Sequence, residues 1–212
     1  MNHHYEKSVI GEERMSFVVA VMKSGYSIVA GDTQLNDDNG PIEATGIKVL
    51  PVDRNIVVGF TGNYLEGRES IDEFISAHKA KKLFSEKAQM LSELLRRRCK
   101  DGNAILVETC ITTTKYALFS SKDDWTSDIQ VLSGVQVKAL FPPDVHEENY
   151  YKNITSPDNL KPQVINCIRA VSRDSASVND KIYGIEMDGY GLKQFTEGIE
   201  FKAITMSYGY LT

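Results

Sequence analysis

The chain has 212 residues, 42% of them hydrophobic and 25% charged, which is ordinary for a soluble globular protein with one well-filled core. Its formal net charge is -5, and its basic cluster Arg96-Arg97-Arg98 with Lys100 lies in a helical pattern with apolar residues on the other side. Proteins that bind nucleic acid usually carry a basic patch, so we expect a solvated helix face here and no nucleic-acid partner.

The cysteines and the apolar runs indicate the compartment. The sequence has three cysteines, Cys99, Cys110 and Cys167, and no two of them have metal-ligand spacing. Their odd number argues against a disulfide framework and fits a reducing environment. No apolar run approaches the ~20 residues needed to span a bilayer. The segment Met1–Arg14 is polar and lacks the apolar centre of a signal peptide. We therefore expect a cytoplasmic protein with no membrane association.

The readable pattern begins after residue 15. We divide the chain into a disordered leader or propeptide at 1–15 and one domain at 16–212. Phe17–Met22 and Ser27–Gly31 are short apolar runs around a Ser-Gly turn signal, which predicts a β-hairpin. Nearly every position in both runs is apolar, which is typical of strands covered on both faces.

The remaining elements follow from turn signals and hydrophobic period. We expect a turn-rich loop at Leu35–Pro41, strands at Ile47–Leu50 and Ile56–Thr61, two helices between about 70 and 99, a hairpin of Ala104–Thr113 with Tyr116–Phe119, a strand at Ile129–Leu132, a helix from Pro162 to Ala170, and strands from Ile182 to Met206 with a turn at Asp188-Gly189. The stretch 141–160 fits no single element, since its prolines forbid one long helix. This order predicts two sheets with helices packed outside them.

One aspartate and one lysine stand where strands end and begin. Asp32 directly follows the strand Ser27–Gly31, and Lys48 lies on the next predicted strand. If these two strands are neighbours, the side chains of Asp32 and Lys48 can form an ion pair. For an arbitrary aspartate and lysine, the pair would be purely structural.

The surrounding motif adds a second interpretation. Its residues are Ser16, Gly25, Ala30-Gly31-Asp32, Lys48 and Gly59-Phe60-Thr61-Gly62. This block resembles the proteasome β subunits, and most closely the bacterial HslV-type peptidases. In that family a strand starts at the nucleophile, a second strand ends in aspartate, and a lysine strand and a glycine-rich turn follow.

Later residues are similar to the same family. Asp174 and Ser177 match an Arg-Asp-x-x-Ser-Gly element, although Val178 stands where glycine is usual. Leu132-Ser133-Gly134 is similar to the Gly-Ser-Gly turn of the family but lacks the first glycine. The resemblance covers residues 16–64 and 163–190, and it implies catalytic roles for Ser133, Asp174 and Ser177.

The resemblance implies a specific chemistry. An N-terminal serine at position 16 would supply both the nucleophilic hydroxyl and the α-amine that takes its proton, because an α-amine has a pKa of about 7.7–8.0. Lys48 would lower the pKa of that amine and Asp32 would orient Lys48, while the N–H of Gly62 would bind the oxyanion. Three further residues, Leu35, Phe60 and Tyr64, fall where the family lines its substrate pocket.

The sequence departs from the family at the nucleophile. The family usually has threonine there, preceded by glycine, whereas this chain has Ser16 preceded by Met15. As written, Ser16 has no free amine. Ser16 could therefore be a strand residue of an inactive subunit, and Gly59 and Gly62 could serve only a tight turn. Asp174 and Ser177 could simply end a helix, and the three pocket residues could be core.

The resulting hypothesis is an α+β protein, an αββα four-layer sandwich with the N-terminal nucleophile hydrolase fold. Its expected function is peptide-bond hydrolysis of polypeptide substrates by Ser16, once this residue is N-terminal. The resemblance implies homo-oligomeric rings and an unfoldase ATPase as partner, and the mechanism needs no metal or organic cofactor. Two alternatives stay open: a non-catalytic proteasome-like subunit, and an N-terminal nucleophile amidohydrolase that acts on a small amide.

Overall fold

The strands form two large antiparallel sheets and one small one. The computed structural model describes residues 16–37, 40–142, 145, 150, 154 and 158–199. The first sheet has the strand order β10-β1-β2-β11-β12 and the second β5-β6-β7-β8-β9, while β3 and β4 pair with each other. Their bounds are β1 Val18–Lys23, β2 Tyr26–Asp32, β3 Gln34–Asp37, β4 Gly40–Thr45, β5 Val49–Asp53, β6 Ile56–Gly62, β7 Gly102–Thr109, β8 Thr114–Ser120, β9 Ile129–Val131, β10 Gln136–Leu140, β11 Ile182–Asp188 and β12 Gly191–Glu197.

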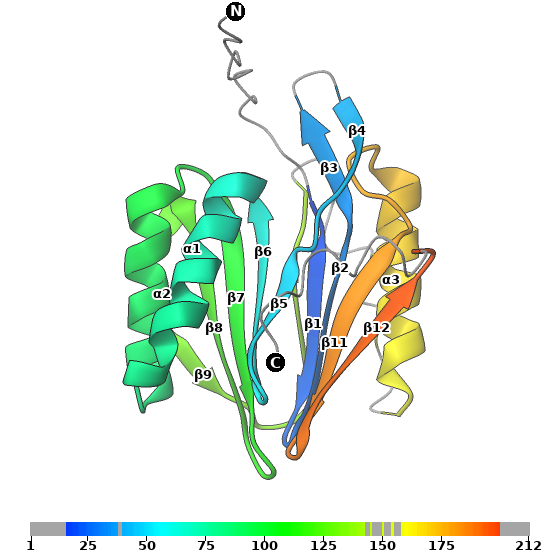
Figure 1. The fold of residues 1–212 in the computed structure, drawn as a ribbon. Coiled ribbons are helices and arrows are strands. Elements are labelled where there is room, and N and C mark those ends of the chain that lie inside the picture. The colour runs from blue at the N-terminus through cyan, green and yellow to red at the C-terminus, as the bar shows by residue number, and fades with distance from the viewer. Residues whose placement is uncertain are drawn as a thin grey trace, which may run out of the picture.

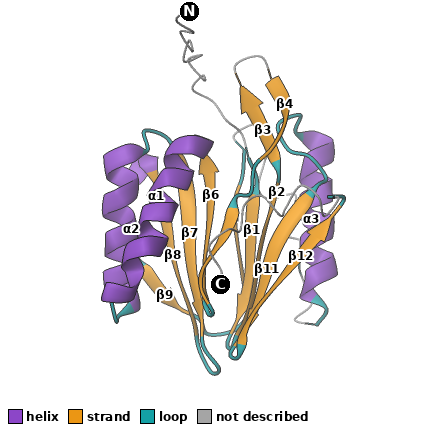
Figure 2. Cartoon of the chain, in the orientation of Figure 1, coloured by secondary structure: helices purple, strands orange, loops and turns teal. Residues whose placement is uncertain are grey.

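Helices cover the outer faces of both large sheets. The α-helices are α1 Tyr64–Ala77, α2 Phe84–Arg98 and α3 Leu160–Asp174, and short 3₁₀ turns lie at His78–Ala80 and Ser121–Asp123. Figure 1 shows α1 and α2 on the second sheet and α3 on the first, with the two sheets facing each other in the middle. Figure 2 shows the same order of layers by element type. The predicted αββα four-layer sandwich is therefore confirmed.

Strand β1 is apolar from Val18 to Met22 because both of its faces are buried. Val18, Ala20 and Met22 belong to the core between the two sheets. Val19 and Val21 belong to the second core, which the first sheet forms with α3. All five side chains are fully buried, so a strand with a period-2 pattern would have placed polar groups in one core or the other.

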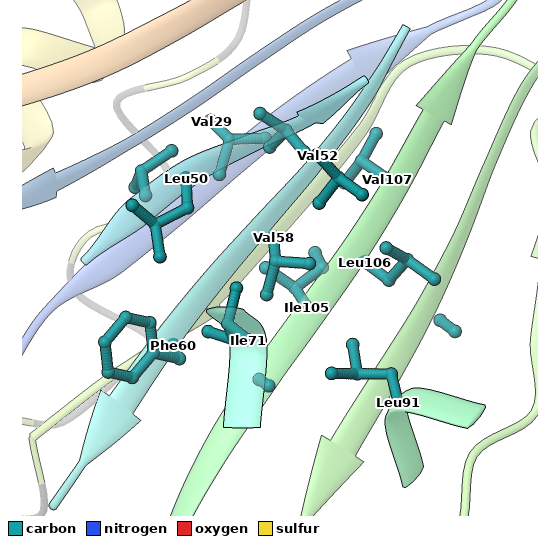
Figure 3. Close-up of a cluster of buried hydrophobic side chains, with 14 of the residues drawn as sticks. Val29, Leu50, Val52, Val58, Phe60, Ile71, Leu91, Ile105, Leu106 and Val107 are labelled. Atoms are coloured by element: carbon teal, nitrogen blue, oxygen red, sulfur yellow. The ribbon is translucent and has the colours of Figure 1, made fainter. Parts of the chain in front are cut away.

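The helices on the second sheet bury the apolar residues whose helical spacing was predicted from the sequence. Ile71 of α1 and Leu91 of α2 are fully buried and lie against Val58 and Leu106 of the sheet (Figure 3). On the other face of the same sheet, a Cβ atom at Gly59 would lie 2.7 Å from Cγ1 of Val18. The two sheets thus approach each other too closely for a side chain at this position.

The two ends of the sandwich differ. At one end the turn between β1 and β2 is bonded to the turn between β7 and β8, because the Thr114 hydroxyl donates to the Lys23 carbonyl at 2.8 Å. Figure 1 shows the sheets meeting at this end and diverging toward the other, from which the β3–β4 hairpin projects. Asp32 at the end of β2 and Gly62 at the end of β6 both lie at the diverging end.

Most predicted elements are confirmed, and three expectations were incomplete or wrong. The expected loop Leu35–Pro41 is part of the hairpin β3–β4, whose turn residues alone carried the loop signal. The strand expected at Ile47–Leu50 runs from Val49 through Pro51 to Asp53, since Pro51 lies at a register shift on an edge strand where no ladder N–H is needed. Strand β10 was not predicted.

Some expectations fall outside the described residues. The leader at 1–15 and the strand pattern from 200 to Met206 are among them. Within the described ranges, no helix is both long enough and apolar enough to cross a membrane.

Candidate active site

A buried ion pair lies at the diverging end of the sandwich. Nζ of Lys48 lies 2.8 Å from Oδ2 of Asp32, and the two residues are only 2% and 1% exposed. The predicted pairing is therefore present, but its geometry differs from the expectation. Asp32 ends β2 of the first sheet and Lys48 directly precedes β5 of the second, so the pair bridges the two sheets instead of joining neighbouring strands of one.

The Asp32 carboxylate also holds the start of the first strand. Its Oδ1 accepts the backbone N–H of Phe17 at 2.8 Å, and its Oδ2 accepts the N–H of Gln34 at 2.8 Å. Phe17 follows Ser16, which is itself 6% exposed. Asp32 thus fixes the backbone next to Ser16 and the Lys48 ammonium through one carboxylate.

Burial controls the charge state of this pair. Burial lowers the pKa of the Lys48 ammonium, and the Coulomb attraction and hydrogen bond of Asp32 oppose that shift. A lysine with a lowered pKa holds its proton less tightly, and without Asp32 the shift would be larger. The carboxylate is therefore what keeps a cation at this buried position.

Backbone hydrogen bonds connect the surrounding strand ends. The Phe60 N–H donates to the Lys48 carbonyl at 3.0 Å, and the Asp32 N–H donates to the Phe17 carbonyl at 3.2 Å. The Thr33 N–H donates to the Lys181 carbonyl at 3.0 Å. The ends of strands from both sheets are thereby held around the ion pair.

Gly62 occupies a backbone conformation that favours glycine. It ends β6 with φ at +102°, and a Cβ atom there would lie 2.6 Å from the carbonyl oxygen of Asp101. This steric demand accounts for glycine at the position whether or not its N–H binds an oxyanion. The role of oxyanion donor stays a prediction.

Two of the three predicted pocket residues, Leu35 and Tyr64, lie next to Gly46, and the third, Phe60, contacts Tyr64. A Cβ atom at Gly46 would overlap Leu35 and lie 3.0 Å from Cε2 of Tyr64. The Tyr64 ring stacks on Phe60 with centroids 5.8 Å apart. Phe60 is only 2% exposed and packs against Gly67 of α1, so it is a core residue, whereas Leu35 and Tyr64 are half-buried.

Asp174 and Ser177 have structural partners. Asp174 ends α3 and its carboxylate accepts the hydroxyl of Tyr150, while the Ser177 carbonyl accepts the side-chain amide of Asn36 at 3.1 Å. Val178, where the family has glycine, is 4% exposed and packs in the core below α3. Within the described part of the chain, no hydrogen bond joins Asp174 or Ser177 to the Asp32–Lys48 pair.

The prediction that Ser133 belongs to the site is wrong. Ser133 is exposed on the connection between β9 and β10. The preceding Leu132 N–H donates to the Thr114 carbonyl at 3.0 Å, and Gln136 pairs with Met22 at the far end of β1. Ser133 therefore lies at the closed end of the sandwich, a whole strand length away from the start of β1.

An aromatic contact near the site was not predicted. The Phe17 ring packs against Phe141 with centroids 4.9 Å apart, and Phe141 packs against Tyr150 at 5.9 Å. These rings connect the residue after Ser16 to the Tyr150 hydroxyl, which holds Asp174. The stretch 141–160 has no regular period, so nothing in the sequence placed Phe141 or Tyr150 here.

Comparison with known proteins bears on the fold. No family model and no curated protein sequence matches the chain. The αββα sandwich is the N-terminal nucleophile hydrolase fold that the sequence predicts. A solved structure with this fold is the Anbu (Gly-1) mutant from Hyphomicrobium sp. strain MC1, which superimposes with a TM-score of 0.63 over 91% of this chain and 92% of that chain. The sequences are 12% identical, so the likeness shows the fold alone.

Proposed function

We propose that the protein is a peptidase that hydrolyses peptide bonds with Ser16 as its N-terminal nucleophile. The observation that supports this most strongly is the buried Lys48–Asp32 pair, whose carboxylate also binds the backbone N–H of Phe17. Burying a charged group costs free energy, and Lys48 stays charged here only because Asp32 pairs with it. An ionisable group held in this way next to the start of the first strand is a candidate for use in chemistry. The αββα fold agrees with this assignment.

The proposed reaction proceeds in two halves. The free α-amine of Ser16 takes the proton of its own hydroxyl, directly or through a water, and Oγ attacks the carbonyl carbon of the substrate. The C–N bond then breaks, and the departing amine receives the proton from the α-ammonium. Water hydrolyses the resulting ester by the same proton path, which releases the acid and restores Ser16.

The neighbouring groups have defined roles in this proposal. The Lys48 ammonium lowers the pKa of the α-amine, so that more of it is neutral at physiological pH. The N–H of Gly62 stabilises the oxyanion that forms on the substrate carbonyl. Leu35 and Tyr64 contact the substrate beside the cleaved bond.

The free amine requires that the functional polypeptide begin at Ser16. Residues 1–15 are then a removable leader, or translation begins at Met15 and a methionine aminopeptidase exposes the serine. The domain is accordingly 16–212. The peptidase is expected to work in the cytoplasm as a peptidase of the HslV type, in homo-oligomeric rings and with an unfoldase ATPase as partner.

The test compares two forms of the protein. Full-length 1–212 and a form that begins at Ser16 are assayed on an unfolded casein substrate, and intact mass spectrometry records the N-terminus and any acyl ester. We expect hydrolysis only from the Ser16 form, loss of activity in Ser16→Ala, and full activity in Ser172→Ala. Ser172 is a matched control because it lies on the outer helix α3 and, among the described residues, its hydroxyl bonds only to a carbonyl of the same helix.

Two results would lead to the alternatives. If the protein from its native source has only the mass of intact Met1–Thr212 and no form cleaves casein, the chain is a non-catalytic subunit. A monomer by light scattering, active on small amides but not on casein, would indicate an amidohydrolase. Rings with casein hydrolysis are the result expected from the proposal.

A further inference from the structure

Two glycines face each other, and one of them is Gly62, the proposed oxyanion donor. Gly62 of β6 pairs with Gly102 of β7. A Cβ atom at Gly62 would lie 2.6 Å from both the Asp101 carbonyl oxygen and the Gly102 Cα. A Cβ atom at Gly102 would overlap the Thr61 carbonyl oxygen and lie 3.3 Å from the Gly62 Cα. Each glycine thus leaves room for the peptide group that contains the other.

This contact determines the direction of one particular N–H. The Thr61 carbonyl and the Gly62 N–H belong to the same planar peptide group, so a displacement of the oxygen rotates the N–H as well. Gly102 has φ at +139°, and Gly62 has φ at +102°, so both positions lie in a region that other residues rarely adopt. The orientation of the Gly62 N–H therefore depends on the absence of a side chain at Gly102.

A serine holds the opposing peptide in place. The Gly102 N–H donates to Oγ of Ser121 at 3.2 Å. Ser121 begins the short 3₁₀ turn that follows β8, and its side chain is half-buried. The Ser121 hydroxyl therefore fixes the Asp101–Gly102 peptide, which in turn lies directly against Gly62.

We propose that Ser121 and Gly102 are positioning residues that aim the Gly62 N–H at the oxyanion. This inference rests on the proposed function. When Oγ of Ser16 bonds to the substrate carbonyl carbon, the π electrons of the carbonyl move to its oxygen, and the hydroxyl proton moves to the α-amine. The N–H of Gly62 stabilises that negative oxygen only if its direction is fixed before the reaction. Ser121 and Gly102 fix it without touching the substrate.

The test measures the affinity for an oxyanion separately from the affinity for a peptide. The probes are acetylated trileucine aldehyde, which forms a tetrahedral adduct with the serine hydroxyl, and the corresponding trileucine alcohol, which does not. We compare the wild-type Ser16 form with Ser121→Ala, Ser121→Thr and Gly102→Ala. Gly134→Ala is the matched control, since Gly134 has φ at +103° but no atom within 4 Å of its notional Cβ.

The expected result is a selective loss of the adduct. Gly102→Ala should lower kcat and aldehyde affinity by about 100-fold, the usual effect of losing one oxyanion donor, and Ser121→Ala by about ten-fold. Alcohol affinity and KM should stay at the wild-type level, and Ser121→Thr should restore the aldehyde affinity because it keeps the hydroxyl. Gly134→Ala should change neither affinity. Ser121→Ala changes only a half-buried side chain, so this variant tests the inference even if Gly102→Ala does not fold.

Two contrary outcomes are distinguishable. An active wild type whose Ser121→Ala variant keeps its aldehyde affinity, or loses aldehyde and alcohol affinity equally, overturns the positioning role and leaves the proposed function intact. A wild type that neither cleaves casein nor binds the aldehyde overturns the proposed function and the positioning role with it.

Discussion

Replacement of Lys48 by methionine should destabilise the protein because it leaves a buried carboxylate without its cation. The methionine side chain keeps most of the apolar volume of lysine and removes only the ammonium. In the structure this ammonium lies 2.8 Å from Oδ2 of Asp32, in a place where both side chains are almost fully buried. Breaking such a pair by removing one partner costs about 3–5 kcal/mol.

The structure indicates which end of that range applies. In Lys48→Met, the Asp32 carboxylate still accepts the N–H groups of Phe17 and Gln34, so we expect about 3 kcal/mol. Asp32→Ala leaves the ammonium alone and also removes the acceptor for both N–H groups, so we expect about 5 kcal/mol. Both variants should lack hydrolytic activity, and their effects should not add in the double variant.

Urea unfolding measures this cost directly. The chain has one tryptophan, and Trp125 is 4% exposed, so its fluorescence reports the loss of packing. Lys87→Met is the matched control, because Lys87 pairs with Glu108 at 3.5 Å while both side chains keep 12% exposure. We expect that control to cost about 1 kcal/mol. A loss from Lys48→Met no larger than the loss from Lys87→Met, at equal m-value, would refute the reasoning.

Three further predictions use the same unfolding assay. In Asp32→Ala, Lys48 loses the carboxylate that opposes the lowering of its pKa, which therefore lies further below the ~10.4 of the unfolded chain; the unfolded state then binds more protons, and stability should rise with pH up to about 10; a flat profile would contradict this. Gly59→Ala should cost about 1–3 kcal/mol, since its Cβ would lie 2.7 Å from Cγ1 of Val18, and an unchanged urea midpoint would show that the sheets can separate. Arg98→Ala should leave the midpoint unchanged at low and high salt, because its ion pair with Glu73 is exposed, and a clear salt-dependent loss would contradict that.

The sequence predicts elements well where each residue must be buried. The first hairpin was readable because its strands are buried on both faces and are apolar at nearly every position. The helices α1 and α2 were readable because their apolar residues repeat with the helical period. Strand β10 was missed because it is a short edge strand whose residues are mostly half-buried, although residues 136–139 alternate polar and apolar side chains. The hairpin β3–β4 was missed for the same reason, since it pairs only with itself.

The sequence predicts the site less evenly. The pairing of Asp32 with Lys48 could be predicted from motif spacing, but spacing along the chain does not say that the two residues belong to different sheets. Ser133 was misplaced because a three-residue match carries no information on which end of a strand it follows. The contact between Gly62 and Gly102 gave no signal, since it joins backbone atoms of residues 40 positions apart.

The same geometry bears on how the proposed enzyme becomes active. The bonds from Asp32 to Phe17 and to Lys48 are all present in a chain that still continues through Met15, so they do not require a free amine. If the proposed function is correct, removal of everything before Ser16 creates the amine beside a cation that is already in position. Activation then changes one covalent bond and needs no new packing. Full-length and Ser16-started proteins should therefore unfold at the same urea concentration while only the shorter one hydrolyses casein; a large difference in stability would show that the site forms only after cleavage.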